Sequence, residues 1–124
     1  MNRPNVSCLQ PLFQQAFDLA DQARLQALAG DALHMLALSA GPLDERIRWN
    51  RRTADYALAS DDPKARYWAG PALNNLGSDL REAKRLPESL QAFQEALQAF
   101  ERMGRAPAVR VARWQVAHVL RLLG

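Results

Sequence analysis

A scarcity of β-branched side chains is the feature that most restricts how this chain can fold. The 124 residues include five valines, one isoleucine and one threonine: Val6, Val109, Val111, Val116, Val119, Ile47 and Thr53. Because these are the residue types that favour strands, the chain has little material for a sheet. Alanine and leucine, which favour helices, dominate instead. The sequence therefore predicts an all-α protein.

Apolar residues recur at helical spacing in six stretches that are separated by proline or glycine. These stretches are residues 12–22, 23–40, 43–60, 60–84, 86–104 and 105–124. We expect Asp62 to cap the fourth helix and Pro63 to occupy its first position. Pro71 predicts a kink near residues 66–67, unless that helix starts later. Gly104 is expected to end the fifth helix, and such short links favour antiparallel neighbours.

Gly77 lies inside a predicted helix, where glycine costs about 1 kcal/mol relative to alanine. An internal repeat explains why a small residue is found at this position. When the sequence is aligned with itself at a shift of about 40 residues, similar residues fall on one another. The shift pairs Leu33 with Leu73 and Trp114, Leu36 with Leu76 and Ala117, and Ala37 with Gly77 and His118. In the alternate helices a shift of 42 pairs Ala54 with Ala96, Ala57 with Ala99 and Leu58 with Phe100. Small residues at matching places indicate closely packed helix pairs.

The order of large and small residues in the segment from Gly70 to Met103 resembles the tetratricopeptide repeat, in its long-helix variety. The residues that carry the resemblance are Leu73, Leu76, Gly77, Leu80, Ser89, Phe93 and Ala96. It implies a right-handed α-solenoid of antiparallel helix pairs, with about six helices. It also implies that the missing side chain of Gly77 leaves room for a ring such as Phe93.

The domain organisation follows from the same pattern. We expect residues 1–10 to form a flexible N-terminus and residues 11–124 a single helical repeat domain. The first helix then reads as the second half of a repeat, and the last helix as the first half of one. We interpret this ending as a fragment of a longer array or an early stop, with self-association as its physical consequence. The candidate residues for self-association are Leu120, Leu122 and Leu123.

Nothing in the sequence favours catalysis, a metal or a cofactor. His34 and His118 lie far apart, and no second histidine or cysteine is spaced to share a metal with either. No glycine-rich loop follows a strand, so a nucleotide cradle is not expected. The lone cysteine, Cys8, excludes an intramolecular disulfide and favours a reducing compartment. No apolar run approaches the ~20 residues of a membrane span. We therefore expect a cytoplasmic protein that is not an enzyme.

The net charge is +3, and arginines form two groups. The first is Arg46, Arg48, Arg51 and Arg52 around Trp49, and the second is Arg105, Arg110, Arg113 and Arg121. Arginine mixed with aromatic side chains can bind nucleic acid or another acidic ligand. Acidic neighbours dilute the first group, however, so we expect a solvated face with Trp49 partly packed. Nucleic-acid binding remains an alternative that the sequence does not favour.

The resemblance implies that the first helix of each pair lines a concave groove, which binds a peptide or helix of another protein. The residues expected to face this groove are His34, Leu38, Asn74, Ser78, Arg81, Gln115 and Val119. Apolar side chains would be buried against the guest, while Asn74 and Arg81 would set its position through hydrogen bonds. The alternative is a self-associating structural module, for example a homodimer formed through the C-terminal end.

Overall fold

The computed structural model describes residues 9–124, and its regular structure there is entirely helical. The helices are α1 (Gln10–Gln22), α2 (Gln26–Ser39), α3 (Leu43–Ala59), α4 (Pro63–Arg66), α5 (Ala69–Glu82), α6 (Leu86–Arg102) and α7 (Ala106–Leu123). α4 is a single turn, and the other six helices pack as antiparallel pairs. The all-α prediction is therefore confirmed. The predicted flexible N-terminus falls mostly on residues 1–8, which lie outside the described part of the chain.

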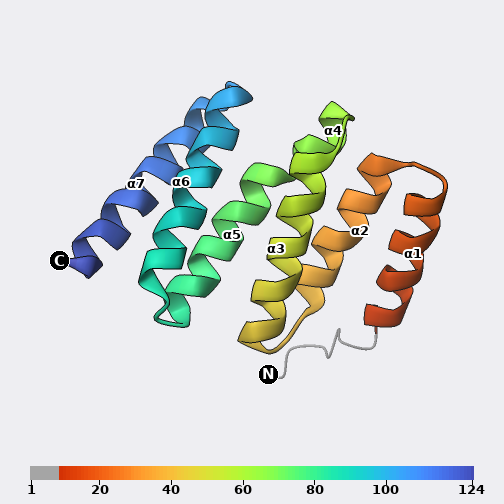
Figure 1. The fold of residues 1–124 in the computed structure, drawn as a ribbon, viewed down its shortest axis with the longest axis horizontal. Coiled ribbons are helices and arrows are strands. Elements are labelled where there is room, and N and C mark those ends of the chain that lie inside the picture. The colour runs from red at the N-terminus through yellow and green to blue at the C-terminus, as the bar shows by residue number, and fades with distance from the viewer. Residues whose placement is uncertain (1–8) are drawn as a thin grey trace.

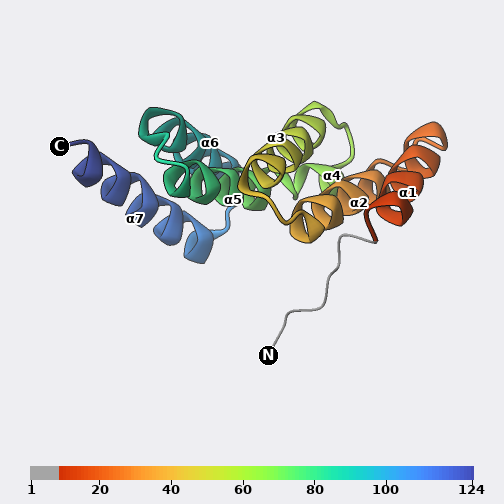
Figure 2. The same cartoon turned by 90° about the horizontal axis from the view of Figure 1, so that it is seen from below.

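The helices form a row in which each long helix packs mainly against its neighbours along the chain. α1 and α7 lie at opposite ends of the row (Figure 1). α3 and α6 lie on one side of it and α2 and α7 on the other (Figure 2). Among the helices of residues 9–124, none has both the length and the apolar character needed to cross a membrane.

Three of the turns between helices share one geometry. Each contains a residue with a positive φ: Arg24 (59°), Lys84 (64°) and Gly104 (66°). The amide that follows it closes the turn by bonding to a carbonyl five residues back, as in a Schellman motif. These bonds are Leu25 N to Ala20 O (2.8 Å), Arg85 N to Leu80 O (2.9 Å) and Arg105 N to Phe100 O (3.1 Å). The predicted stop at Gly104 is confirmed, since α6 ends at Arg102.

The fourth predicted helix is broken in two. The carboxylate of Asp62 accepts a hydrogen bond from the backbone N–H of Lys64 (2.9 Å), and Pro63 is the first residue of α4, as expected. The helix is interrupted at residues 67–68, and α5 then begins at Ala69. Pro71 is the third residue of α5. Backbone N–H groups in the first turn of a helix have no carbonyl partner within the helix, so a proline at this position removes no hydrogen bond. The irregularity predicted near residues 66–67 is present, but as a full break at residues 67–68 and not as a kink in one helix.

Gly77 is buried where α5 meets α6. A Cβ atom added to it would lie 2.7 Å from two ring carbons of Phe93, whose side chain is fully buried. The expectation that the glycine leaves room for this ring is confirmed. Gly70 has the same relation to the ring of Phe100. The hydroxyl of Ser89 donates to the carbonyl oxygen of Gly77 (2.7 Å), so the two backbones approach closely at this point.

Burial repeats along the chain with an offset of 40 residues. The buried residues of α2 correspond to buried residues of α5: Ala29 and Ala69, Gly30 and Gly70, Ala32 and Ala72, Leu33 and Leu73, Leu36 and Leu76, Ala37 and Gly77. The same offset places the buried Ala112 of α7 on Ala72. The offset of 40 also places the small residue Ala117 on Gly77. The alignment made from the sequence alone used an offset of 41 in α7 and placed His118 on Gly77. That part of the alignment is wrong by one residue.

The offset of 42 in the alternate helices matches burial at two of its three pairs, Ala54 with Ala96 and Ala57 with Ala99, but fails at the third. It pairs Leu58 with Phe100, but Leu58 is 48% exposed and Phe100 is buried. Burial instead follows an offset of 39: Asn50 with Ser89, Thr53 with Ala92, Ala54 with Phe93, and Ala57 with Ala96. Polar side chains therefore occupy two buried positions of α3. A pattern read only from apolar residues could not find them.

Candidate functional site

The residues expected in the groove differ widely in exposure. Leu38 of α2 is exposed, Val119 of α7 is fully buried, and the other five are half-buried: His34, Asn74, Ser78, Arg81 and Gln115. The prediction for Val119 is wrong, because a side chain with no exposed surface cannot contact a guest. The offset of 40 explains the error: Trp114 and His118, not Gln115 and Val119, correspond to Asn74 and Ser78.

Arg81 and Gln115 are brought together, but they bind each other. A guanidinium N–H of Arg81 donates to the side-chain oxygen of Gln115 (2.5 Å) and links α5 to α7. The same guanidinium lies 5.6 Å from the centre of the Phe93 ring. Arg81 therefore connects α5 to α7, and in this structure its hydrogen bond is made within the chain.

An unbroken series of three aromatic rings and one guanidinium in contact, here called the aromatic ladder, crosses from α2 to the start of α7. It consists of His34, Trp68, Tyr67 and Arg105. The rings of His34 and Trp68 stack with their centres 4.4 Å apart. Trp68 meets Tyr67 edge to face at 5.7 Å, and the guanidinium of Arg105 lies 4.7 Å from the centre of the Tyr67 ring. The far side of this guanidinium is near Phe100 (5.4 Å).

Two clefts open beside the ladder. The Trp68 cleft, of about 560 Å³, lies between α2 and α4 and is lined by Ala27, Leu28, Asp31, Pro63, Lys64, Tyr67, Trp68 and Met103. The Asn74 cleft, of about 250 Å³, lies between α5 and α7 and is lined by Pro71, Asn74, Asn75, Phe100, Arg105, Ala108 and Val111. Both are mostly apolar with a few polar groups, which is the usual character of a binding site.

Three buried polar atoms along the ladder and its clefts have no hydrogen-bond partner among the described residues. They are Nδ1 of His34, Oδ1 of Asn74 and one terminal nitrogen of Arg105. Buried polar groups in proteins are nearly always paired, so such atoms need an explanation. Burial lowers the pKa of His34 below its ordinary value, against an opposing effect of the carboxylate of Asp31. His34 is thus held in its neutral form near pH 7, with one ring nitrogen free to accept or donate.

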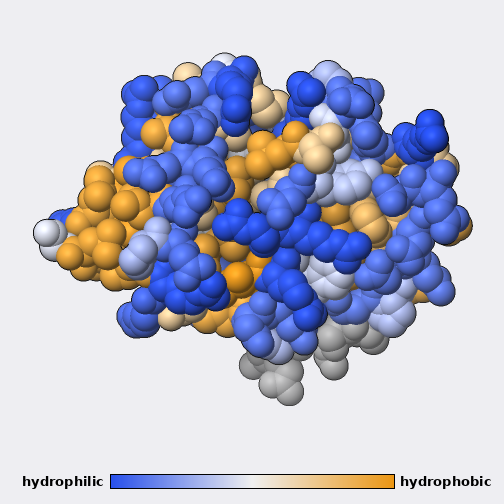
Figure 3. All heavy atoms as spheres, viewed as in Figure 1, coloured by the Kyte–Doolittle hydropathy of each residue, from blue (hydrophilic) through white to orange (hydrophobic). Residues whose placement is uncertain are grey.

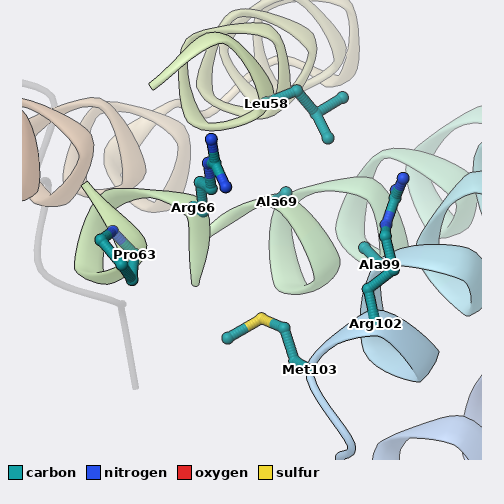
Figure 4. Close-up of a pocket in the computed structure, with 7 residues that line it drawn as sticks. All are labelled: Leu58, Pro63, Arg66, Ala69, Ala99, Arg102 and Met103. Carbon is teal, nitrogen blue, oxygen red and sulfur yellow. The ribbon is translucent and has the colours of Figure 1, made fainter. Parts of the chain in front are cut away.

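A further pocket of about 330 Å³ adjoins the Trp68 cleft, with which it shares Pro63 and Met103. Figure 4 shows its lining residues from the end of α3, from α4 and α5, and from the end of α6: Leu58, Pro63, Arg66, Ala69, Ala99, Arg102 and Met103. The side chain of Arg66 is held by a hydrogen bond from its Nε to the carbonyl oxygen of Ser60 (2.6 Å). The pocket could take an apolar side chain between two cationic groups.

The first arginine group is largely occupied by contacts within the chain. Arg46 bonds to Glu82 (3.0 Å) and lies 3.6 Å from Asp79, and Arg51 lies 3.7 Å from Glu95. Arg52 lies over the rings of Trp49 (5.3 Å) and Phe17 (4.9 Å), and Arg48 lies over Trp49 (5.8 Å). Trp49 is half-buried against the core, so the expectation that it is partly packed is confirmed.

Within residues 9–124, no three His, Cys, Asp or Glu side chains gather as metal ligands would. Cys8 lies outside this part of the chain. Comparisons with protein-family models, with curated proteins and with solved structures found no match.

Sequence reasoning missed Tyr67 and Trp68, and it placed Arg105 only in a basic group. A signal was present. Two adjacent aromatic residues stand at the helix break that Pro71 predicts, and side chains at a break can leave the face of the helix that precedes them. Their stacking with His34 and Arg105 depends on segments more than 30 residues away, so spacing could not reveal it.

Proposed function

We propose that this chain is a short α-solenoid of the tetratricopeptide kind and that it binds an extended segment of another protein along the aromatic ladder. The row of neighbour-packed helices supports the solenoid, because in such folds each unit contacts only its neighbours. The recurrence of burial at an offset of 40 and the small residues Ala37, Gly77 and Ala117 at matching positions support it as well.

The single observation that carries the binding proposal is the set of unpartnered atoms on His34, Asn74 and Arg105. An extended guest chain offers a backbone N–H and C=O at every residue. Both atoms have almost no exposed surface in the free protein, so each side chain would first rotate into the Asn74 cleft, which both residues line. Asn74 would then accept from such an N–H, and Arg105 would donate to a carbonyl or carboxylate oxygen. Each bond would relieve a desolvation cost that is already present in the free protein.

Apolar contacts would supply the remaining affinity. Tyr67 and Trp68 of the ladder line the Trp68 cleft and Arg105 lines the Asn74 cleft, so side chains of a guest that follows the ladder could enter both. Leu28 and Tyr67 are 58% and 39% exposed at the first cleft. The contacts that occupy the first arginine group count against nucleic acid as the guest.

The test is selection of binders from an array of extended peptides, followed by fluorescence anisotropy with purified variants. We expect Asn74→Ala and Tyr67→Ala each to weaken a selected peptide about tenfold or more, which corresponds to about 1.4 kcal/mol. Gln98→Ala, an exposed polar position on α6, is the matched control and should leave affinity unchanged.

Circular dichroism would show that all three variants keep their helices. The proposal fails if no peptide binds, or if Asn74→Ala and Tyr67→Ala bind selected peptides as tightly as the parent protein. An oligonucleotide that binds while peptides do not would favour the arginine-based alternative.

A further inference from the structure

The two helices at the ends of the row leave apolar side chains uncovered. On α1, Leu12 and Leu19 are 60% and 68% exposed, and on α7 the exposed fractions of Trp114 and Leu120 are 61% and 50%. Leu122 and Leu123 are also exposed. Figure 3 shows hydrophobic residues gathered over α7 at the left end of the molecule. Uncovered apolar patches of this kind mark contact surfaces.

The uncovered face of α1 has a buried counterpart inside the same molecule. The turns at Arg24 and Gly104 have the same geometry, so α1 and α2 correspond to α6 and α7 with an offset of 80. That offset places Leu12, Phe13, Ala16 and Leu19 on Ala92, Phe93, Ala96 and Ala99. All four residues of α6 are buried: Ala92, Ala96 and Ala99 lie in clusters with residues of α3 and α5, and the ring of Phe93 lies against Gly77 of α5. α1 therefore presents the face that α6 buries.

The uncovered face of α7 has a buried counterpart as well. The offset of 40 places Ala117 on Gly77 and Leu120 on Leu80. Gly77 and Leu80 are buried in α5, where Gly77 meets the ring of Phe93 of α6. Ala117 and Leu120 are exposed. Thus, among residues 9–124, no helix contacts α7 as α6 contacts α5, and none contacts α1 as α5 contacts α6.

We propose that a second copy of the chain supplies both missing partners, with α7 of one copy lying in the groove between α1 and α2 of the next. This groove has a volume of about 660 Å³ and is lined mostly by apolar residues: Phe13, Ala16, Leu19, Ala20, Ala23, Leu25, Leu28, Asp31, Ala32 and Met35. In this arrangement α7 and α1 of the next copy pack as α5 and α6 do within one copy.

The Asn74 cleft shows how the contact would fit. In that cleft Asn74 of α5 lies beside Phe100 and Arg105. At the junction between copies, the offset of 40 puts Trp114 in the place of Asn74. The offset of 80 puts Ala20 and Leu25 of the next copy in the places of Phe100 and Arg105. At the junction the ring of Trp114 replaces the smaller Asn74, while the small Ala20 replaces the ring of Phe100, so the two changes in volume offset each other. The apolar Leu25 replaces the guanidinium of Arg105.

Charge favours a head-to-tail contact over a symmetric one. α7 carries Arg110, Arg113 and Arg121 and no acidic residue. α1 carries Asp18 and Asp21 and no basic residue, and Asp31 lines the groove. Opposite charge attracts the two ends, whereas two α7 helices placed face to face would oppose six arginines. A head-to-tail contact that does not close produces open-ended chains.

Sedimentation velocity over a wide range of protein concentration tests the proposal. For the parent protein we expect a mean mass that keeps rising with concentration past the dimer. High salt should weaken the association about tenfold, because charge attraction contributes to it. Trp114→Asp and Leu19→Asp change exposed residues, one on each contact surface, and each variant alone should remain a monomer. Leu58→Asp changes an exposed leucine elsewhere and should associate like the parent.

Mixing provides the decisive result. Trp114→Asp retains an intact groove and Leu19→Asp retains an intact α7, so an equimolar mixture should form a one-to-one dimer and nothing larger. Leu120→Asp and Leu12→Asp form a second pair, used if thermal unfolding shows that the first pair is destabilised. A parent protein that is monomeric throughout overturns the proposal. So does a Leu19→Asp variant that still dimerises alone, since that result indicates a symmetric contact through α7.

The two proposals can be tested separately, although Leu28 and Asp31 line both the groove between α1 and α2 and the Trp68 cleft. None of these substitutions changes Tyr67 or Asn74, so a monomeric variant can still be tested for the proposed guest. Loss of self-association together with retained peptide binding, or the reverse, separates the two proposals.

Discussion

At the scale of single residues, Gly77 shows how one missing side chain decides the distance between two helices. We expect Gly77→Ala to lower the free energy of unfolding by about 2 kcal/mol, because its Cβ would lie 2.7 Å from a buried ring. Alanine would otherwise gain about 1 kcal/mol over glycine inside a helix. A net loss, measured by urea unfolding, therefore reports the clash itself.

Gly41→Ala is the control for this substitution, because a Cβ at Gly41 meets nothing within 4 Å. Its stability should stay within about 0.5 kcal/mol of the parent. The double variant Gly77→Ala with Phe93→Leu should lose at least about 1 kcal/mol less than the sum of the two single losses. A cost of less than about 0.5 kcal/mol for Gly77→Ala would contradict the close approach of α5 and α6.

At the scale of helices, a polar contact joins α3 to α5. The side-chain amide of Asn50, which is 4% exposed, donates to a carboxylate oxygen of Asp79 (2.9 Å), and Arg46 lies 3.6 Å from the same carboxylate. Burial raises the pKa of Asp79 above its ordinary value, while the charge of Arg46 and the hydrogen bond from Asn50 oppose this rise. The folded state therefore holds the proton of Asp79 more tightly than the unfolded state does.

The raised pKa of Asp79 determines whether the free energy of unfolding rises or falls with pH. The cost of burying the charge is fully present above the folded pKa. It is relieved as the pH falls through that value towards about 3.9, the pKa of an unperturbed aspartate. We expect the stability of the parent protein relative to Asp79→Asn to rise as the pH is lowered from neutrality. Urea unfolding of both proteins along a pH series measures this difference. A relative stability that falls with the pH would show that the ion pair with Arg46 outweighs burial.

At the scale of the whole molecule, each long helix is stabilised mainly by its neighbours along the chain. Within the described part of the chain, α5 and α6 have helical partners on both sides, whereas α1 and α7 have them on one side only. For the monomer, we expect amide protons of α5 between Leu73 and Leu80 to exchange at least about tenfold more slowly than those of α7. Hydrogen exchange of the Trp114→Asp variant, which should remain monomeric, gives this comparison. Equal protection along the chain would indicate a single cooperative unit.

The helical class, most helix ends and the break before Pro71 could be predicted from the amino-acid sequence, because they depend on residues close together in the chain. The tight packing at Gly77 was expected from the resemblance of this segment to the tetratricopeptide repeat. The offset of 39 in the alternate helices, the burial of Val119 and the contacts among His34, Trp68, Tyr67 and Arg105 emerged only from the packed helices. Those features depend on how each helix rotates about its own axis when it packs. A shift of one residue turns a side chain by about 100°, which is enough to move Val119 from the groove to the core.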